Sequence, residues 1–324
     1  METKELGRSG IAVSRVILGC GNFGGVGSSP AFFGEGTRKD EAFRIMDAAW
    51  ELGITTFDTA DAYGGGRSER FIGEWLAEKD GSVRDTIVIE TKTFNPNEAD
   101  ADHGLARDRI RRQIDVSLGR LGLERVALYL AHDYDPDVPQ EETLRAFDEL
   151  VRAGKVGSVG ASNFTGAQLS EALGVSGREA ITRYEWAQSS LSLLDLDEEH
   201  GVLPVCREHG LGFEAYGPLA GGWLTGKYRR GGAYPAGSRM TQRPESYERY
   251  ENDRVYDALE AFEREALGRG VSMAGLATAW LMGEPDVTAV VAGPVRAEHL
   301  EPVREALALE LTPAERPHLR GLFE

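Results

Sequence analysis

The chain contains little cysteine and no long apolar run. Cys20 and Cys206 are the only cysteines among its 324 residues. No stretch approaches the ~20 apolar residues of a membrane-spanning helix, and the first residues lack the apolar segment of a signal peptide. We therefore expect a cytoplasmic protein that binds no membrane and carries two free thiols in place of a disulfide.

Basic residues are scarce as well. The chain has 36 Lys and Arg against 53 Asp and Glu, and its net charge of -17 repels nucleic acid and anionic lipid at long range. We expect neither as a partner. Residues 215–244 are the exception, because they contain no Asp or Glu, and this local reversal of charge predicts a site for a polyanion. Their basic residues are Lys227, Arg229, Arg230, Arg239 and Arg243.

Patterns that would bind a metal ion are also missing. The six histidines do not form H-E-x-x-H or a comparable zinc-binding spacing. Asp133, Asp135 and Asp137 alternate as in a calcium loop. Val138 and Leu144, however, stand where such a loop requires glycine and glutamate. We therefore expect no metal site.

A glycine-rich segment after the first strand matches a dinucleotide fingerprint but lacks its context. Residues 19–24 read G-C-G-N-F-G, which fits G-x-G-x-x-G. In a doubly wound fold a helix begins at the last glycine and points at the pyrophosphate. Here glycine and serine continue, and a helical pattern begins only near Asp40. The sequence therefore disfavours a Rossmann domain.

Short apolar runs alternate with amphipathic helical patterns along the whole sequence. This alternation is typical of βαβ units around a parallel sheet, and strands that are apolar throughout are buried on both faces. Eight strands and eight helices with short links predict a closed (β/α)8 TIM barrel, in a single domain over residues 1–324. The predicted strands are Val16–Gly19, Thr55–Asp58, Val88–Thr91, Val126–Ala131, Val156–Ala161, Ile181–Ala187, Leu211–Tyr216 and Val287–Ala292.

Two stretches fall outside this alternation. Residues 1–15 have the pattern of a small β-hairpin with its turn at residues 7–10, placed to close the lower end of the barrel. Residues 218–250 form a long connection rich in Gly, Pro and Arg before a helix that begins near Asn252. Loops of this length are usually lids, binding loops or disordered segments.

Reactive side chains stand at the ends of three predicted strands. Asp58 ends the second strand, and Tyr63 follows it five residues later. Lys92 follows the third strand and His132 the fourth. Because neighbouring strand ends meet on one face of a parallel barrel, we expect the four side chains to converge. Each one alone also has an ordinary structural explanation, such as a turn cap or a solvated lysine.

These four side chains together suit the reduction of a carbonyl group. Hydride transfer to the carbonyl carbon leaves negative charge on the oxygen, which must then receive a proton. Tyr63 can donate that proton if Lys92 lowers the tyrosine pKa from its usual ~10. Asp58 would keep a buried Lys92 charged, and His132 would donate a hydrogen bond to the carbonyl oxygen.

The same residues lie in motifs that resemble those of the aldo-keto reductases. Residues 57–64 follow the family pattern F-D-T-A-x-x-Y-G, residues 91–92 its T-K, and residues 132–136 its H-x-x-D-P. The resemblance extends over nearly the whole chain. It implies a barrel that reversibly reduces aldehydes or ketones with NADPH, with Tyr63 as the general acid.

The resemblance also implies where a nicotinamide cofactor binds. Ser162, Asn163 and Gln188 would hold the carboxamide, and Tyr216 would stack on the ring and so set which face delivers hydride. The segment after Tyr216 would wrap the pyrophosphate, where the acid-free stretch already predicts an anion. The other implied cofactor residues are Cys20, Gly21, Asp58, Gly217, Pro218, Leu219, Gly222, Leu224, Gly226, Lys227, Arg239, Gly293, Val295, Arg296 and His299.

Two departures from the family pattern affect binding. Pro302 and Val303 replace the terminal Glu-Asn of P-G-A-x-x-x-E-Q-L-x-E-N, which puts the adenine contacts in question. Arg296 still offers a donor for the adenosine 2′-phosphate, so we expect NADP(H) to be favoured over NAD(H). Cys20 and Gly21 replace a Thr and a bulky residue, which predicts a roomier acceptor site. Its expected lining is Asn22, Phe23, Phe33, Tyr63, Phe94, His132 and Tyr134, although the aromatic residues other than Tyr63 could equally be scaffold.

The sequence therefore predicts a reductase for a small carbonyl or alcohol substrate and leaves two alternatives open. One is a cofactor-bound redox sensor or partner-binding subunit, as the potassium-channel β subunits of this family partly are. The other is a barrel that acts on a nucleotide-linked sugar or another bulky metabolite. The substrate and the oligomeric state stay open.

Overall fold

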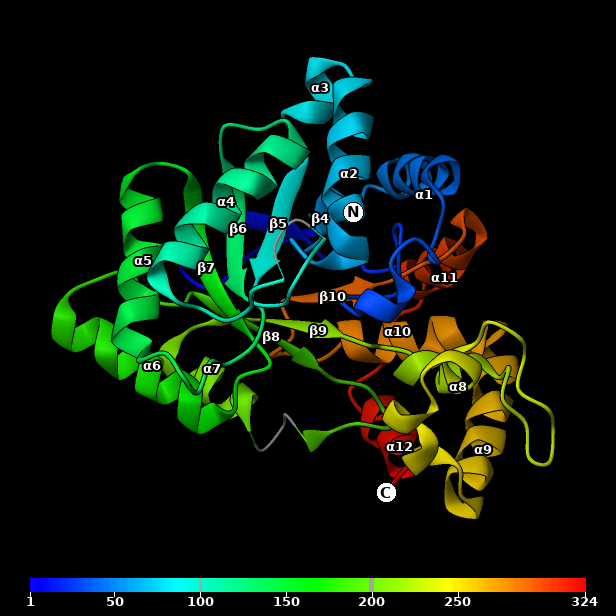
Figure 1. Cartoon of the computed structure of the whole chain (residues 1–324). Coiled ribbons are helices and arrows are strands. Elements are labelled where there is room, and N and C mark those ends of the chain that lie inside the picture. Colours follow the sequence, from blue (N-terminus) through cyan, green and yellow to red (C-terminus); the bar gives the residue numbers. More distant parts are fainter. Residues whose placement is uncertain (99–100, 198–200) are drawn as a thin grey trace.

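Eight parallel strands close into a barrel in the computed structural model, which describes residues 1–98, 101–197 and 201–324. The strands lie at the centre and the helices around them (Figure 1). The order around the barrel follows the sequence, and β10 pairs with β3 to close it. This confirms the predicted (β/α)8 fold. The strands are β3 Val16–Gly19, β4 Thr56–Asp58, β5 Val88–Thr93, β6 Val126–Ala131, β7 Val156–Ser162, β8 Trp186–Ser190, β9 Gly212–Tyr216 and β10 Ala289–Ala292.

Several helices bury one apolar stripe, whereas α10 is buried nearly all round and α3 buries no residue. In α5, for example, Leu144, Phe147 and Leu150 are buried at helical spacing. Within the described residues, no helix combines the length and the apolar character needed to cross a membrane. The helices are α1 Lys39–Glu51, α2 Arg67–Ala77, α3 Gly81–Arg84, α4 Arg107–Leu121, α5 Gln140–Arg152, α6 Gly166–Glu179, α7 Val202–His209, α8 Arg239–Gln242, α9 Asp253–Arg269, α10 Met273–Met282, α11 Glu301–Ala308 and α12 Glu315–Gly321.

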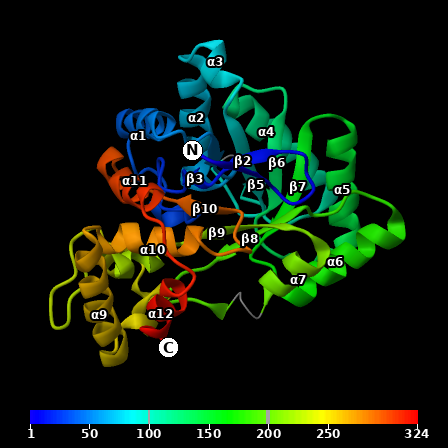
Figure 2. The same ribbon diagram turned by 180° about the vertical axis from the view of Figure 1, so that it is seen from behind.

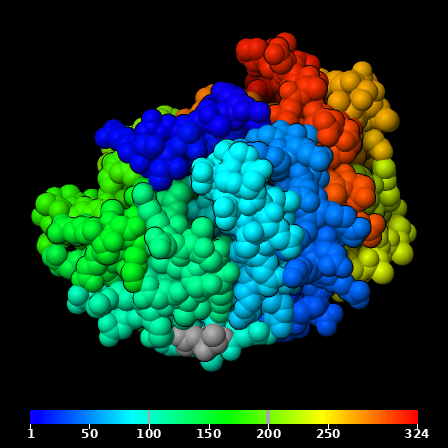
Figure 3. Space-filling model, turned by 90° about the horizontal axis from the view of Figure 1, so that it is seen from above, coloured from blue at the N-terminus to red at the C-terminus, as the bar shows by residue number. Residues whose placement is uncertain are grey.

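The amino-terminal hairpin covers one end of the barrel, as predicted. Strands β1 Thr3–Glu5 and β2 Ala12–Ser14 pair antiparallel, and Figure 2 shows them lying across the strands. Figure 3 shows the same segment as a dark-blue ridge at the edge of the molecule. Gly7 has φ +60, and a Cβ there would lie only 2.0 Å from the carbonyl oxygen of Glu185. This close approach requires glycine and fixes the hairpin on the barrel.

The sixth barrel strand differs from the prediction. It was expected at Ile181–Ala187, but β8 runs from Trp186 to Ser190. Helix α6 ends at Ala180 in the left-handed conformation, and residues 181–185 connect it to the barrel. The carboxyl half of β8 carries buried polar side chains, including Gln188 and Ser189. The search for an apolar run therefore predicted this strand too early in the sequence, because the barrel interior is polar at this position.

The long connection after β9 is folded back onto α9. It contains the turn η4 Ala220–Thr225 and α8, and α9 begins as predicted, with the Asn252 side chain accepting from the backbone N–H of Val255. Arg229 pairs with Glu263, and Arg230 pairs with three acidic residues of α9. These ion pairs tie the connection to α9, beside which it lies in Figure 1.

Candidate active site

Four predicted residues converge where β4, β5 and β6 end. Lys92 donates hydrogen bonds to Asp58 Oδ1 and, over 3.1 Å, to the carbonyl oxygen of Thr59. The Lys92 Nζ lies 5.2 Å from the centre of the Tyr63 ring. Tyr63 Oη and His132 Nε2 are 3.5 Å apart. Because Lys92 and Asp58 are almost fully buried, this is an ion pair withdrawn from water.

A turn rich in glycine carries Tyr63 into this group. The turn, η2 Tyr63–Gly66, contains three glycines with positive φ. Gly64 has φ +58, and a Cβ there would lie 2.6 Å from the carbonyl oxygen of Phe23. Only glycine allows the tyrosine turn to press this closely against the end of β3.

The protonation of Tyr63 differs from the expectation. Burial raises the pKa of Tyr63 to about 12, although Lys92 pulls it down. The prediction of a lowered pKa is therefore wrong for the protein alone, because the loss of hydration outweighs the cation. Burial alone would lower the pKa of Lys92, but Asp58, Tyr63 and Glu90 raise it above its usual value. At neutral pH the site therefore holds a protonated phenol beside a charged ammonium.

His132 is held neutral with its proton on a defined nitrogen. Burial, assisted by Lys92, lowers the pKa of His132 to about 3. The side-chain Nδ2 of Asn95 lies 3.3 Å from His132 Nδ1. Since an amide nitrogen only donates, Nδ1 accepts, and we assign the proton to Nε2, which faces Tyr63. His132 can thus donate a hydrogen bond toward an oxygen bound beside Tyr63.

Asn163 connects the two halves of the site. It follows β7 with φ +60, its Nδ2 donates to the carbonyl oxygen of His132 over 2.8 Å, and its Oδ1 accepts from the Tyr216 hydroxyl over 2.8 Å. Ser162, the last residue of β7, is buried next to it. Both ends of the Asn163 amide are therefore engaged. A contact between Asn163 and a carboxamide would require one of these two bonds to open.

Gln188 offers an open acceptor in the barrel. Its Nε2 donates to Glu90 over 2.6 Å, to Glu214 over 3.0 Å and to Asp58 over 3.2 Å. No described residue donates a hydrogen bond to its Oε1. These acidic partners fix which way the amide points, and its oxygen is the group that would accept from the amide of a nicotinamide. The predicted role of Gln188 therefore fits the donors and acceptors that are present.

Positive charge gathers at the predicted anion site. Arg296 and Lys227 both contribute to lowering the pKa of His299, after burial, so these side chains lie within electrostatic reach of one another. Neither Arg296 nor Lys227 forms an ion pair with a described residue. Gly222 has φ +99, and a Cβ there would lie 2.3 Å from Lys227 Nζ. Of the five basic residues of the acid-free stretch, Arg229 and Arg230 are instead paired with α9.

Comparison with known proteins agrees with this geometry. The model of the Aldo/keto reductase family matches residues 15–323. The chain belongs to the aldo/keto reductase family. It is 36% identical over 320 residues to "Uncharacterized oxidoreductase YrpG" of Bacillus subtilis (strain 168), covering 96% of this chain and 92% of the relative.

Other relatives carry different descriptions. A "Probable voltage-gated potassium channel subunit beta" of Oryza sativa subsp. japonica is 31% identical over 100% of this chain and 96% of the relative. "Aldo-keto reductase yakc [NADP(+)]" of Schizosaccharomyces pombe is 30% identical over 86% of this chain and 82% of the relative. Membership of the family supports carbonyl–alcohol oxidoreduction in general.

The segment predicted to bind adenine lacks the polar pair of the family pattern. Pro302 lies in the first turn of α11, and Val303 is buried against the core. Neither side chain can hydrogen-bond a base. Among the other residues predicted for this segment, Val295 is exposed, and its backbone N–H lies 3.5 Å from His299 Nδ1.

The end of β3 leaves space over Tyr63. A Cβ on Gly21 would lie 3.5 Å from the Tyr63 ring, so a bulky side chain at this position would cover that ring. Cys20 is fully buried beneath it, and burial raises the pKa of its thiol. The Asn22 side chain accepts from Arg239 over 2.8 Å and thereby ties α8 to this strand end. Of the predicted cofactor residues, Leu224 is also fully buried.

The predicted substrate residues divide into two groups. Phe23 is fully buried in the core, and the expectation that it lines the substrate site is corrected to a packing role. Phe94 and Tyr134 are partly buried and follow β5 and β6, next to the residues that end those strands. Phe33 lies beside the tyrosine turn, with its ring 2.9 Å from a Cβ built on Gly65. A role for these three rings in lining the substrate site stays a prediction.

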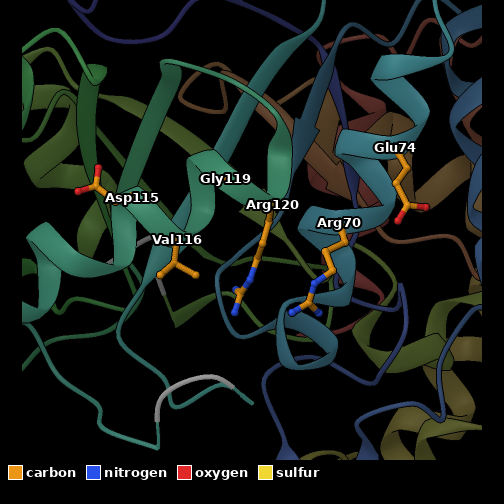
Figure 4. Close-up of a pocket in the computed structure, with 6 residues that line it drawn as sticks. All are labelled: Arg70, Glu74, Asp115, Val116, Gly119 and Arg120. Carbon is orange, nitrogen blue, oxygen red and sulfur yellow. The ribbon is translucent and has the colours of Figure 1, made fainter.

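Sequence reasoning missed several residues that support the site. Glu90 lies two residues before Lys92 on β5, so the period of a strand could have placed it on the same face. Glu214 similarly interrupts an apolar strand. Arg120 donates to the carbonyl oxygen of Asp61 behind the tyrosine turn and also lines a surface pocket of about 460 Å³ between α2 and α4 (Figure 4). No sequence signal marked Arg120, because it acts through a tertiary contact.

Proposed function

We propose that this protein is an NADP(H)-dependent oxidoreductase that reduces aldehydes or ketones to alcohols and catalyses the reverse reaction. The observation that carries the proposal is the buried Lys92–Asp58 ion pair beside a protonated Tyr63 and a neutral His132. Such a group has no evident structural use, since burying a charged pair is costly. A small carbonyl or alcohol compound is the expected substrate.

In this proposal each residue has a defined task. The bound cofactor would supply the hydride to the carbonyl carbon. Tyr63 Oη donates its proton to the carbonyl oxygen, and His132 Nε2 donates the hydrogen bond that orients it. Lys92 stabilises the phenolate that Tyr63 becomes, and Asp58 keeps Lys92 charged. Burial of this group excludes water and strengthens each of these interactions.

The decisive test is the loss of NADPH absorbance with a panel of aldehydes and ketones. We expect Tyr63→Phe to lower kcat by about 10²-fold or more, because the proton donor is removed while the ring is kept. Circular dichroism and thermal unfolding of the same variant serve as the control for folding. The proposal fails if the correctly folded variant keeps its turnover.

The basic cluster supports NADP(H) over NAD(H). Lys227 and Arg296 have no carboxylate partner among the described residues, and a relative is named as NADP(+)-dependent. We expect Arg296→Ala to raise the KM for NADPH by about 10- to 100-fold, the worth of a hydrogen bond to a charged group, and to change the KM for NADH little. Arg304→Ala, a substitution on the surface of α11, is the matched control. Equal effects on both cofactors would contradict a 2′-phosphate site.

A redox sensor or partner-binding subunit is the second candidate. It is favoured by the relatives from Oryza sativa and Arabidopsis thaliana that are named as potassium-channel β subunits. A sensor would hold the cofactor tightly and turn over very slowly with every carbonyl compound. Measured rates of cofactor exchange and of single turnover distinguish this from a reductase, in which both are fast.

A further inference from the structure

A layer of acidic side chains lies inside the barrel beneath the proposed catalytic group. Glu90 of β5, Gln188 of β8 and Glu214 of β9 are buried. Strands β5 and β8 are not neighbours, so the bond between Glu90 and Gln188 crosses the interior. On the side of the hairpin the barrel is filled with apolar residues, which are Leu6, Val13, Ile17, Leu128, Leu130, Trp186, Ala289 and Val291. The layer is therefore closed to water from that end.

The charges of this layer do not balance. Three buried carboxyl groups, those of Asp58, Glu90 and Glu214, surround the single ammonium of Lys92. Tyr63, Cys20 and His132 are the other titratable groups in reach; burial raises the pKa values of Tyr63 and Cys20 and lowers that of His132, so all three stay neutral. Full ionisation would bury a net negative charge, which is costly in a medium of low dielectric constant. At least one carboxyl group must therefore carry a proton at neutral pH.

The proton belongs to the two glutamates. Their carboxyl groups lie within hydrogen-bond reach of each other, and Glu90 also reaches Asp58. Glu90 Oε2 and Glu214 Oε1 otherwise have no hydrogen-bond partner. Burial raises the pKa of both groups, and each is further raised by the charge of a neighbouring carboxylate. A proton shared between the two would satisfy these oxygens and remove the excess charge.

From this pair to Tyr63, each group lies within hydrogen-bond reach of the next. Glu90 reaches Asp58, Asp58 accepts from Lys92, and Lys92 reaches the Tyr63 hydroxyl. We propose that Glu90 and Glu214 hold one proton between them and return it to Tyr63 through Asp58 and Lys92 after each reduction. This inference rests on the proposed function.

The step balances as follows. The carbonyl carbon takes the hydride, the oxygen takes the Tyr63 proton, and a phenolate remains. Lys92 gives a proton to the phenolate and takes one from Asp58, which takes one from Glu90. The glutamate pair is then fully ionised and recovers a proton from solvent water after the product leaves. Hydride transfer forms the new C–H bond, the return of the proton to Tyr63 changes only O–H and N–H bonds, and one proton from water is consumed for each carbonyl reduced.

The test uses Glu90→Gln, Glu214→Gln and the double variant in the full chain. Glutamine keeps the size and hydrogen bonds of glutamate but cannot release a proton. Glu185→Gln is the control, because Glu185 is partly buried but pairs with Arg183, away from the proposed catalytic group. We expect the control to keep the pH profile of the parent protein.

The first readout is the infrared spectrum of the protein without substrate. We expect a carbonyl stretch from protonated carboxylic acids that shifts in D2O and loses the share of the glutamate pair in the double variant, whereas the share of Asp61 persists. This readout needs no turnover, so it still decides whether the pair holds a proton if no carbonyl substrate is ever found. An unchanged band in the double variant overturns the proposal. If the double variant does not fold, the single variants are compared in the same way.

The second readout separates hydride transfer from the return of the proton to Tyr63. In a single turnover Tyr63 still carries its own proton, so we expect the first hydride transfer to change less than about twofold. Steady-state kcat should fall by about tenfold or more, at the low end for proton-transfer catalysis, and lose its decline above neutral pH. A double variant that lacks the infrared band of the glutamate pair but keeps the kcat and pH profile of the parent would overturn the return of this proton to Tyr63.

Discussion

Two clusters of buried charge lie on opposite faces of strand β5. Lys92 and Glu90 point into the barrel, whereas Thr91 and Thr93 point toward helices α2 and α4 and bond the acids of the outer cluster. The inner cluster consists of Asp58, Glu90, Lys92 and Glu214. The outer cluster consists of Asp61, Glu69, Arg109 and Arg120.

The outer cluster has as many bases as acids. Arg120 Nη1 lies 3.1 Å from Glu69 Oε2, and Arg109 Nη2 lies 3.8 Å from Asp61 Oδ2. Arg109 also donates to the carbonyl oxygens of Gly104 and Asn95. These bonds connect α4 to the loops that follow β4 and β5. The outer cluster thus holds Tyr63 and Asn95 in place from behind.

The comparison shows what distinguishes structural from reactive buried charge. Burial and Glu69 raise the pKa of Asp61 to about 7 despite Arg109, so burial alone perturbs protonation in both clusters. The inner cluster differs in its excess of acid and in its hydrogen-bonded connection to Tyr63. A perturbed carboxyl therefore indicates chemistry only where its proton has a path to the reacting atoms.

The largest expected effect is on activity, from loss of the inner cation. Lys92→Met should lower kcat/KM by about 10²- to 10⁴-fold, because Tyr63 loses the charge that stabilises its phenolate. Steady-state kinetics with NADPH measures this. Lys79→Met, which removes a partly exposed lysine paired with Asp47, is the control and should leave kcat/KM unchanged. Similar losses in both variants would refute a special role for the inner cluster.

A second substitution tests the outer cluster through stability. Arg109→Met should lower the free energy of unfolding by about 3–5 kcal/mol, because Asp61 is left buried without its cation. Urea denaturation measures this, and kcat of the folded fraction should fall much less than in Lys92→Met. Arg107→Met on the exposed face of α4 should cost under about 1 kcal/mol. A fall in kcat of Arg109→Met as large as that of Lys92→Met would contradict the distinction between a structural and a reactive cluster.

The smallest effect concerns the pH dependence of stability. Burial raises the pKa of Glu214 to about 7 and raises that of Glu90, so the folded state binds more protons than the unfolded state. The stability that these two glutamates contribute is complete below their pKa in the unfolded chain, roughly 4, and is lost as pH rises through about 7. The free energy of unfolding of the Glu90→Gln/Glu214→Gln protein should fall less over this range. The contribution of Asp61 to this pH dependence should persist in the variant. An unchanged slope of the free energy of unfolding against pH would show that the inner pair is already ionised.

Local patterns predicted much of the fold. Seven barrel strands lie where apolar runs end in polar residues, because a strand between two buried faces needs apolar side chains on both. The sixth was misplaced at Ile181, since β8 carries Gln188 and Ser189 into a polar interior. Motif spacing named Asp58, Tyr63, Lys92 and His132, and the structure brings them together. Asn95 and Arg120 escaped notice because only the folded chain brings them near the site.

The linear order of residues was enough to specify an eight-stranded barrel with reactive side chains at its strand ends, because strand period and turn residues act over a few positions. The state of protonation required the folded chain. Burial raises the pKa of Tyr63, and burial together with the charge of Asp58, on a strand distant in sequence, raises those of Glu90 and Glu214. Electrostatic energy depends on distance and on exclusion of water, and both are set only when the barrel closes.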